Sequence, residues 1–378
     1  MYEDIRPYDD AQAVAALHRV AQEPVTARIS AYLFPDREPG ALAALLRDIR
    51  GVDDFQHRVM SPAVEAILTR TTDGLSISGE ENMRLLAGRR FVLLANHRDI
   101  VLDSAILEYV LERNGIPCTE IAAGNNLITL PFVRDLMRSN RMVTVIRDSS
   151  SHDRFRVSME FSQYIRSLVT SSGGNSIWLA HRGGRAKNGE DLTEPGLLKM
   201  LDLSGEGSFE DNFAALPIMP VCISYEYEPC AMLKARETVL TRRDGEYHKA
   251  PMEDMQSVVT GIVQPKGRVH LAFGEPVSAA EIAEAAACSR NERYRYLASL
   301  IDAHLLDLYH VWPTAEAAYC LAEGVSDSDT AAFEAYLEHE VSRAPMALEG
   351  GPQLSDADLT AIRSAMIRLY AAPILRRS

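Results

Sequence analysis

The sequence predicts an α/β protein with a central, mostly parallel sheet and flanking helices, and with further helical regions at both ends of the chain. Over residues 76–280, short apolar or β-branched runs alternate with segments of helical periodicity, which is typical of βαβ units. Before and after that range, apolar residues recur at the three-to-four spacing of helices. We therefore expect an N-terminal helical region (residues 1–75), an α/β domain (76–280) and a C-terminal helical region (281–378).

The N-terminal region is expected to contain at least three helices. Residues 10–21 and 41–50 place apolar side chains at helical spacing, and Pro39-Gly40 interrupts the pattern between them. Residues 61–71 offer a further helix with Pro62 near its start, a position at which proline is tolerated.

The α/β domain is expected to alternate strands with helices. The strand-like runs are residues 75–78, 91–95, 120–123, 142–146, 176–180, 218–225 and 268–273. The helical segments between them include residues 104–113, 131–139 and 153–170. Ligands of parallel sheets bind beyond the carboxyl ends of the strands. Because His97, Gly124, Arg147 and His181 each follow a predicted strand, we expect them to converge on one edge of the sheet.

The C-terminal region is expected to be helical, and its clearest segments are residues 291–310, 327–341 and 355–371. Ser326, Ser355 and Asp356 are candidate helix caps, and residues 348–352 have the composition of a linker. Residues 359–370 combine an apolar stripe with arginines. Such a stripe either packs on a core or lies on a membrane surface, and the sequence alone leaves both interpretations open.

Composition and charge exclude several classes of protein. The formal net charge is −14, which argues against a nucleic-acid-binding protein, since those carry a basic face. A local basic patch facing a phosphate or an anionic lipid is still compatible with that charge. The five cysteines include no C-x-x-C pair, so neither a zinc site of the usual spacing nor a disulfide framework is expected. The chain lacks a signal-peptide pattern and any long apolar span, so we expect a cytoplasmic protein, soluble or peripheral to a membrane.

The segment from Ala95 to Asp103 carries the strongest functional signal. The apolar run 91–95 delivers His97 to the end of a strand, and Asp103 follows six residues later, where a helical pattern begins. A histidine backed by a carboxylate can remove a proton from an alcohol. The competing interpretation is structural, because aspartate is also a preferred residue at helix starts.

Three more segments follow in order. They are residues 121–127 with 145–148, residues 178–189, and residues 218–227 around Pro220. Together with residues 96–103, they resemble the blocks of the glycerol-3-phosphate acyltransferase family, within the larger lysophospholipid acyltransferase group. Those blocks are N-H-x4-D, I-A-A-G-x-N-L with F-I-R-R, E-G-x-R-S-R and a proline-centred V-P-V. The resemblance covers roughly residues 75 to 230, and the order and spacing make it more specific than any single block.

The sequence departs from the family pattern at three positions. Five residues separate His97 from Asp103 where the family has four, which we interpret as a bulge or a longer turn, with Asp99 as the alternative partner of His97. Arg182 or Gly183 stands where the family's third block has its glutamate. Asp148 follows Arg147 where the family has a second arginine.

The residues and the resemblance together predict acyl transfer with His97 as the general base. Imidazole accepts a proton near neutral pH, and Asp103 or Asp99 would fix its tautomer and stabilise the imidazolium. The alcohol would attack a thioester directly, so we expect no metal and no tightly bound cofactor. Backbone N–H groups of Gly183 and Gly184 are expected to bind the oxyanion of the tetrahedral intermediate.

A phosphate on the acceptor requires positive side chains. Arg147, Arg185 and Lys187 are the predicted phosphate-binding residues, and Arg98 is a further candidate. The competing interpretation is that they are solvent-facing loop charges. Gly124 and Asn126 belong to a predicted turn that would line the substrate pocket.

We therefore expect an enzyme of phospholipid biosynthesis. As the resemblance implies, it would move a fatty acyl group from coenzyme A or acyl carrier protein to glycerol 3-phosphate, with peripheral membrane contact as an open possibility and no nucleic-acid partner. A lysophospholipid or dihydroxyacetone phosphate is the alternative acceptor. Two alternatives come from other classes: an inactive protein that binds lipid or acyl carrier, and a metal phosphohydrolase that uses His97, Asp99 and Asp103.

Overall fold

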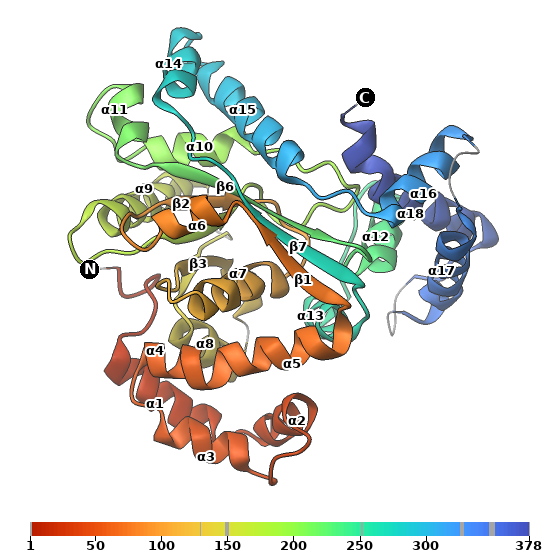
Figure 1. Ribbon diagram of the computed structural model, residues 1–378, viewed down its shortest axis with the longest axis horizontal. Coiled ribbons are helices and arrows are strands. Elements are labelled where there is room, and N and C mark those ends of the chain that lie inside the picture. Colours follow the sequence, from red (N-terminus) through yellow and green to blue (C-terminus); the bar gives the residue numbers. More distant parts are fainter. Residues whose placement is uncertain are drawn as a thin grey trace.

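The computed structural model describes residues 2–128, 130–147, 151–250, 252–325, 329–347 and 352–377. A seven-stranded sheet lies at its centre, with helices on both faces. Helices α1–α4 lie on the outer side of α5, and α16–α18 lie beside the opposite part of this layered body (Figure 1). Asp148, the candidate cap Ser326 and most of the predicted linker 348–352 fall outside the described residues.

The sheet confirms the predicted fold class and adds its strand order. Its strands are β1 (Gly74–Ser78), β2 (Val92–Ala95), β3 (Glu120–Gly124), β4 (Met142–Val145), β5 (Ile177–Ala180), β6 (Ile218–Tyr225) and β7 (Arg268–Phe273), in the order β1-β7-β6-β2-β5-β3-β4. The five strands β2 to β6 are mutually parallel. Strand β7 is antiparallel to β6 and parallel to β1. The carboxyl ends of β2 to β6 therefore meet at one edge, and β1 and β7 point away from it.

Side chains alternate between two cores, one on each face of the sheet, as the pleat of a strand requires. Val92 and Leu94 pack in the core formed with the larger group of helices. Those helices are α9 (Ser151–Thr170), α10 (Pro195–Asp202), α11 (Phe209–Ala214), α14 (Ala279–Ala287) and α15 (Arg293–Leu308). Leu93 and Ala95 pack in the opposite core with α5 (Ser61–Thr71), α6 (Glu80–Leu85) and α7 (Leu102–Arg113). Strand β2 is buried on both faces, so its carboxyl end is rigidly placed.

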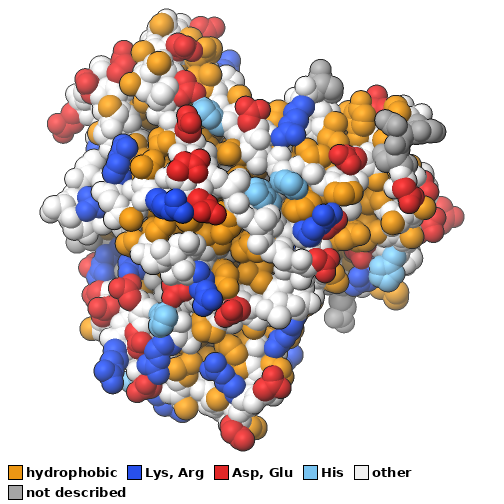
Figure 2. Space-filling model, viewed as in Figure 1, with side chains coloured by type: hydrophobic (Ala, Val, Ile, Leu, Met, Phe, Trp, Pro, Cys, Tyr) orange, Lys and Arg blue, Asp and Glu red, His pale blue; other side chains and the backbone are white. Residues whose placement is uncertain are grey.

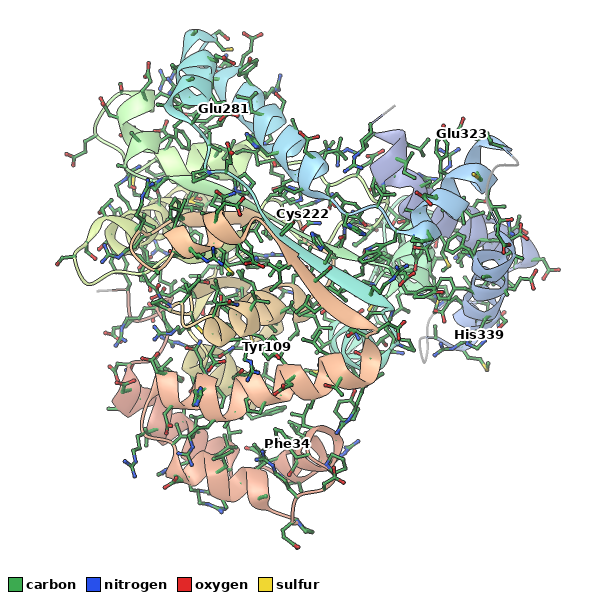
Figure 3. All side chains as sticks on the ribbon, viewed as in Figure 1. Phe34, Tyr109, Cys222, Glu281, Glu323 and His339 are labelled. Carbon is green, nitrogen blue, oxygen red and sulfur yellow. The ribbon has the colours of Figure 1, made fainter. Side chains whose placement is uncertain are left out.

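The N-terminal helices form a third core. The elements are α1 (Asp10–Val20), α2 (Pro24–Leu33), α3 (Ala41–Asp48), α4 (Val52–Phe55) and a π-helical turn (Gln56–Met60) that leads into α5. Leu17, Leu46 and Phe55 are buried among them, and Figure 3 shows Phe34 in the same group. Helix α8 (Pro131–Ser139) joins them to the sheet, because Arg19 bonds Asp135 at 2.8 Å.

The C-terminal helices form a fourth core beside the sheet edge. The elements of this core are α12 (Ala231–Asp244), α16 (Pro313–Glu323), α17 (Ala331–Arg343), a 3-10 turn (Ala344–Met346) and α18 (Asp356–Leu375). Helix α13 (Glu253–Val263) lies outside it, and its Ile262 packs in the core that contains α5. Ser355 caps α18 in a reciprocal capping box with Asp358. Ile362, Met366 and Leu369 are buried in this core. The apolar stripe of residues 359–370 therefore packs against protein, and the interpretation of this segment as a membrane-surface helix is wrong.

The surface carries charges of both signs. Figure 2 shows acidic and basic side chains interspersed over the visible face. His339 lies on the outer helix α17, whereas Cys222 lies in the centre of the molecule (Figure 3). Among the described residues, no helix is long and apolar enough to cross a membrane. The predicted division at residues 75 and 280 stays a prediction, and α14 and α15 share the core of the sheet.

Candidate active site

The His97–Asp103 pair forms directly after strand β2. His97 follows the strand in a loop, and Asp103 lies in the first turn of α7. The His97 Nδ1 atom lies 2.9 Å from the Asp103 Oδ2 atom. The His97 side chain is 14% exposed and that of Asp103 is 2% exposed. The ring therefore reaches the surface while its carboxylate partner does not, and no described residue makes a hydrogen bond to the His97 Nε2 atom.

Asp103 is held by four hydrogen bonds that together explain the unusual spacing. Besides the imidazole, Oδ2 accepts from the backbone N–H groups of Arg98 at 2.6 Å and Asp99 at 2.9 Å. Oδ1 accepts from the Tyr225 hydroxyl at 2.9 Å. The loop with its extra residue thus folds back around the carboxylate. Burial, with the Asp103 carboxylate next in importance, raises the pKa of Tyr225 well above its ordinary value, so the phenol stays a donor.

Asp99, the alternative partner, has a different position. Its Oδ1 accepts from the backbone N–H groups of Val101 at 2.9 Å and Leu102 at 2.8 Å, which forms a side-chain turn that leads into α7. Its Oδ2 is buried against Gly261 of α13, where a Cβ atom would lie 2.1 Å away. Burial, reinforced by the neighbouring Asp103, raises the pKa of Asp99. The structure therefore places Asp103, and not Asp99, against the imidazole.

Neighbouring elements fix the loop that carries His97. Asn96 exchanges two hydrogen bonds with the backbone of Ile223 in β6, at 2.9 and 2.8 Å. The backbone N–H of Ala186 donates to the His97 carbonyl at 3.0 Å. Trp178 of β5 meets the His97 ring edge-to-face, with centroids 5.7 Å apart. Each contact comes from a strand or loop at the same edge of the sheet, so the ring has a defined orientation.

The second predicted block also comes together at this edge. Gly124 ends β3, and a Cβ atom there would lie 2.8 Å from the Arg147 Nε atom and 2.5 Å from the Asn126 Oδ1 atom. The Arg147 side chain therefore lies across Gly124 and beside Asn126, an approach that only glycine permits. The Arg147 backbone N–H donates to Asn125 at 3.2 Å. As the sequence predicted, these residues share one place.

Arg185 lies between the His97 loop and helix α13. Burial raises the pKa of Asp99, and the charge of Arg185 opposes that rise. Burial also opposes ionisation of Asp254, but Lys249, Asn126 and Arg185 together lower the pKa of that carboxyl. The Arg185 Nη1 atom is buried and has no hydrogen-bond partner among the described residues. A buried guanidinium N–H without a partner is costly, so Arg185 is well suited to receive an anion.

Asp254 of α13 sits beside the same group of side chains. The Asn126 Nδ2 atom donates to Asp254 at 3.3 Å, and Lys249 bonds the same carboxylate at 2.5 Å. Asp254 therefore lies with Asn126 at this edge, near enough to Arg185 to feel its charge. Nothing in the sequence around Asp254 signals this position, because α13 comes to the site from a distant part of the chain.

Two predicted phosphate-binding residues are placed differently. Lys187 is paired with Glu237 of α12, so its charge is already compensated. Arg98 is buried and bonds Asp191 at 2.5 Å, with Glu228 at 3.5 Å. Although burial opposes ionisation of Asp191, Arg98 and His181 hold the pKa of that carboxyl well below its usual range. The prediction that Arg98 binds a substrate phosphate is therefore wrong, because its guanidinium is enclosed in an internal ion pair.

The remaining predicted residues lie in the loop after β5. His181 is fully buried, with its Nδ1 atom 3.3 Å from the Thr193 hydroxyl, so it does not join the surface-accessible group. Gly184 has a positive φ of 87°, the conformation that favours glycine. The oxyanion role of Gly183 and Gly184 stays a prediction. Tyr225 was not predicted from the sequence as a partner of Asp103. Its place at the end of the apolar run 218–225 could have indicated a side chain at this edge of the sheet.

A metal-centred alternative does not fit this geometry. Both Asp103 oxygens already accept hydrogen bonds from N–H and O–H donors. Among residues 2–377, outside the undescribed gaps, no group of three or more His, Cys, Asp or Glu side chains is arranged to hold a metal ion. The phosphohydrolase hypothesis would need such a group, since those enzymes commonly hold two metals.

The region that carries this site matches a family model. Residues 74–224, which contain β1 to β5, all but the last residue of β6, and the His97–Asp103 pair, match the family model described as Acyltransferase. Their match begins at β1 and ends one residue before Tyr225, so α12, α13 and the C-terminal helices lie outside it.

Curated glycerol-3-phosphate acyltransferases are similar to part of this chain. A glycerol-3-phosphate acyltransferase from Pseudomonas syringae pv. tomato is 27% identical over 225 residues, which cover 59% of this chain and 26% of the relative. One from Pseudomonas fluorescens (strain SBW25) is 27% identical over 214 residues, which cover 56% of this chain and 24% of the relative. The chain thus spans about a quarter of the length of these relatives.

A solved structure is also similar to the chain. The 1-acyl-sn-glycerophosphate (LPA) acyltransferase PlsC from Thermotoga maritima aligns with a TM-score of 0.40 and 15% sequence identity, over 79% of this chain and 95% of that one.

Proposed function

We propose that this protein transfers an acyl group from a thioester to a hydroxyl of a glycerol-phosphate type acceptor, with glycerol 3-phosphate as the first candidate. The observation that carries the proposal is the His97–Asp103 pair: the Nδ1 atom bonds a buried carboxylate, the ring is partly exposed, and the Nε2 atom is free of described partners. The acyltransferase match of residues 74–224 supports the reaction type.

The reaction follows from the tautomer that Asp103 selects. A carboxylate accepts hydrogen bonds and cannot donate them, so the proton of neutral His97 lies on Nδ1, leaving Nε2 as the base. Nε2 removes the proton of the acceptor hydroxyl as its oxygen attacks the thioester carbonyl carbon. The C–S bond then breaks, and the imidazolium returns the proton to the departing thiolate. The products are an ester and a free thiol, and Asp103 stabilises the transient imidazolium.

We propose that Arg185 and Arg147 hold the acceptor phosphate. Arg185 offers a buried N–H without a partner, and Arg147 lies with Asn126 at the end of β3. Lys187 is the weaker candidate because Glu237 already pairs with it. The donor is a coenzyme A or acyl-carrier-protein thioester, which brings its own reactive carbonyl, so this scheme uses no cofactor.

Product analysis with the purified full chain tests the proposal. Labelled acyl-CoA and acyl-carrier-protein donors are offered with glycerol 3-phosphate, dihydroxyacetone phosphate and a lysophospholipid, and the esters are identified by mass spectrometry. We expect His97→Ala to lower kcat by about 10²–10⁴-fold, as for loss of a general base. His304→Ala is the matched control, because His304 also bonds a carboxylate, that of Glu281 at 2.6 Å, outside the site.

Two outcomes would contradict the proposal. Equal turnover by the wild type and His97→Ala would remove His97 as the base. Tight binding of donor and acceptor without turnover, over the whole donor and acceptor panel, would identify an inactive binding protein instead.

A further inference from the structure

A network of buried charges lies directly behind the His97 loop. It consists of Arg98, Asp191, Glu228 and Lys234, and each of these side chains is at most 6% exposed. Lys234 bonds Glu228 at 2.5 Å, and the Glu228 Oε1 atom lies 3.5 Å from Arg98, which itself bonds Asp191 at 2.5 Å. The two cations and two carboxylates balance, so the network is neutral as a unit.

Lys234 connects this network to the backbone of the catalytic loop. Its Nζ atom donates to the Arg98 carbonyl oxygen at 2.6 Å. The Arg98 backbone N–H, on the other side of the same residue, donates to Asp103 at 2.6 Å. The Lys234 bond therefore fixes the residue whose N–H orients the carboxylate that holds His97.

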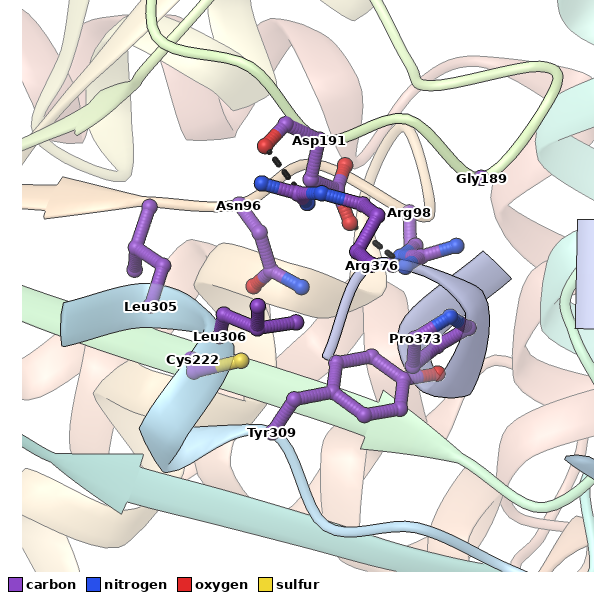
Figure 4. Close-up of a pocket in the computed structure, with 10 residues that line it drawn as sticks. All are labelled: Asn96, Arg98, Gly189, Asp191, Cys222, Leu305, Leu306, Tyr309, Pro373 and Arg376. Atoms are coloured by element: carbon purple, nitrogen blue, oxygen red, sulfur yellow. Dashed lines mark hydrogen bonds and ion pairs between the residues drawn. The ribbon is translucent and has the colours of Figure 1, made fainter. Parts of the chain in front are cut away.

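The C-terminal helix α18 completes this support. The Glu228 backbone N–H donates to the Tyr370 hydroxyl at 2.8 Å, and Arg376 donates to the Asp191 carbonyl at 2.9 Å. Figure 4 shows Asp191 between Arg98 and Arg376, at a small pocket that Tyr309 and Pro373 also line. Glu228, Lys234, Tyr370 and Arg376 all lie outside the acyltransferase match of residues 74–224.

We propose that Lys234 is a positioning residue for the His97–Asp103 pair, acting through Arg98, and that α12 and α18 form a scaffold that the acyltransferase domain of this chain requires for an ordered active site. The catalytic consequence rests on the proposed function, whereas the ordering of His97 does not. Buried ion networks are often replaceable by apolar side chains without loss of stability. A contribution to loop geometry accounts for this network, because Lys234 donates to a backbone carbonyl of the loop.

The test compares variants that separate charge balance from positioning. Lys234→Met removes both the charge and the donor to the Arg98 carbonyl. The double variant Glu228→Gln with Lys234→Met restores a neutral network and keeps an acceptor oxygen near Arg98, yet it still lacks that donor. Arg236→Met is the matched control, because Arg236 is a buried cation on the same helix that bonds Tyr247 and the Pro352 carbonyl instead.

Two readouts are independent of turnover. ¹⁵N NMR of the histidine rings reports the tautomer of His97, and amide exchange reports the N–H groups of Arg98 and Asp99 that bond Asp103. In the wild type and in Arg236→Met we expect the Nδ1–H tautomer and slow exchange of these two amides. In the double variant we expect mixed tautomers and at least tenfold faster exchange, with the fold retained by circular dichroism.

The kinetic arm gives the catalytic consequence. The double variant should lower kcat by about 10–100-fold with little change in KM, the range expected when a catalytic group is misplaced. A double variant with wild-type tautomer, exchange and kcat would overturn the proposal, since the network would then act through charge balance alone. If the wild type transfers no acyl group, the proposed function fails, and the NMR and exchange measurements still decide the role of Lys234.

Discussion

The His97–Asp103 loop and the cationic side chains around it lie at the same edge of the sheet but are held in opposite ways. In the loop, Asp103 accepts hydrogen bonds from four groups of the protein itself: the His97 ring, two backbone N–H groups and the Tyr225 hydroxyl. Around the cations, carboxylates from α12 and α13 are already neighbours of the proposed phosphate-binding side chains: Glu237 pairs with Lys187, and Asp254 lies beside Asn126 and near Arg185.

The His97–Asp103 loop is therefore assembled before substrate binds. In our proposal, the cationic side chains instead exchange a protein carboxylate for the acceptor phosphate. Preorganised groups accelerate a reaction because they need no rearrangement in the transition state. A carboxylate in an anion pocket instead competes with the incoming phosphate. We therefore expect changes in the loop to lower kcat and changes among the cations to alter KM for the acceptor.

The largest effect is expected for Asp103→Asn. The amide cannot stabilise the imidazolium and can favour the wrong tautomer, so kcat should fall by about 10³–10⁴-fold. Asp99→Asn is the matched control: asparagine forms the same side-chain turn to the backbone as aspartate does, and we expect kcat to stay within about threefold of the wild type. Similar losses in both variants, measured by steady-state kinetics, would restore Asp99 as a partner of His97.

The next effect is expected for Arg185→Met. Hydrogen bonds to charged groups contribute about 1.5–3 kcal/mol, so KM for glycerol 3-phosphate should rise about 10–100-fold while kcat changes little. Lys187→Met should change KM by less than about threefold, because pairs at partly exposed sites contribute little. Initial rates at saturating donor provide the measurement. A fall in kcat with constant KM would contradict a role of Arg185 in acceptor binding and would indicate that it acts in the chemical step, as the His97–Asp103 loop does.

A smaller effect is expected for Tyr225→Phe. The change removes one donor to Asp103 and should lower the free energy of unfolding by about 1–3 kcal/mol, with up to about a tenfold loss in kcat. Tyr164→Phe is the control, because Tyr164 also bonds a buried carboxylate, that of Glu120 at 2.5 Å, away from the site. Urea unfolding should show comparable losses of stability. Equal losses of kcat would show that stability alone explains the effect.

The smallest effect is expected for Asp254→Asn. Neutralising this carboxylate removes a competitor for Arg185 and Asn126. Charge interactions at partly exposed sites contribute up to about 1 kcal/mol, so we expect KM for the acceptor to fall about two- to fivefold. Asp244→Asn on α12 is the control, since Asp244 pairs with Arg243 instead. A higher KM in Asp254→Asn would make Asp254 part of acceptor binding, and the contrast between the two regions would then disappear.

Local pattern predicted most elements of the fold. The apolar runs at 218–225 and 268–273 coincide with β6 and β7, and residues 131–139 coincide with α8, because burial on both faces of a strand and on one face of a helix leaves a direct trace in hydropathy. The reversed direction of β1 and β7 left no such trace. Strand direction depends on pairing between residues almost two hundred positions apart, such as Leu75 with Val269.

The sequence by itself determined the strands, many of the helices and the proximity of His97 to Asp103, since a strand end and the following helix start are only a few residues apart. Tertiary structure alone decided which carboxylate bonds His97 and which cations are already paired. Asp191, Glu228, Glu237 and Asp254 reach the site from segments far along the chain. The physical reason is that the state of a charged side chain depends on its nearest opposite charge in space, and spacing along the chain does not specify that neighbour.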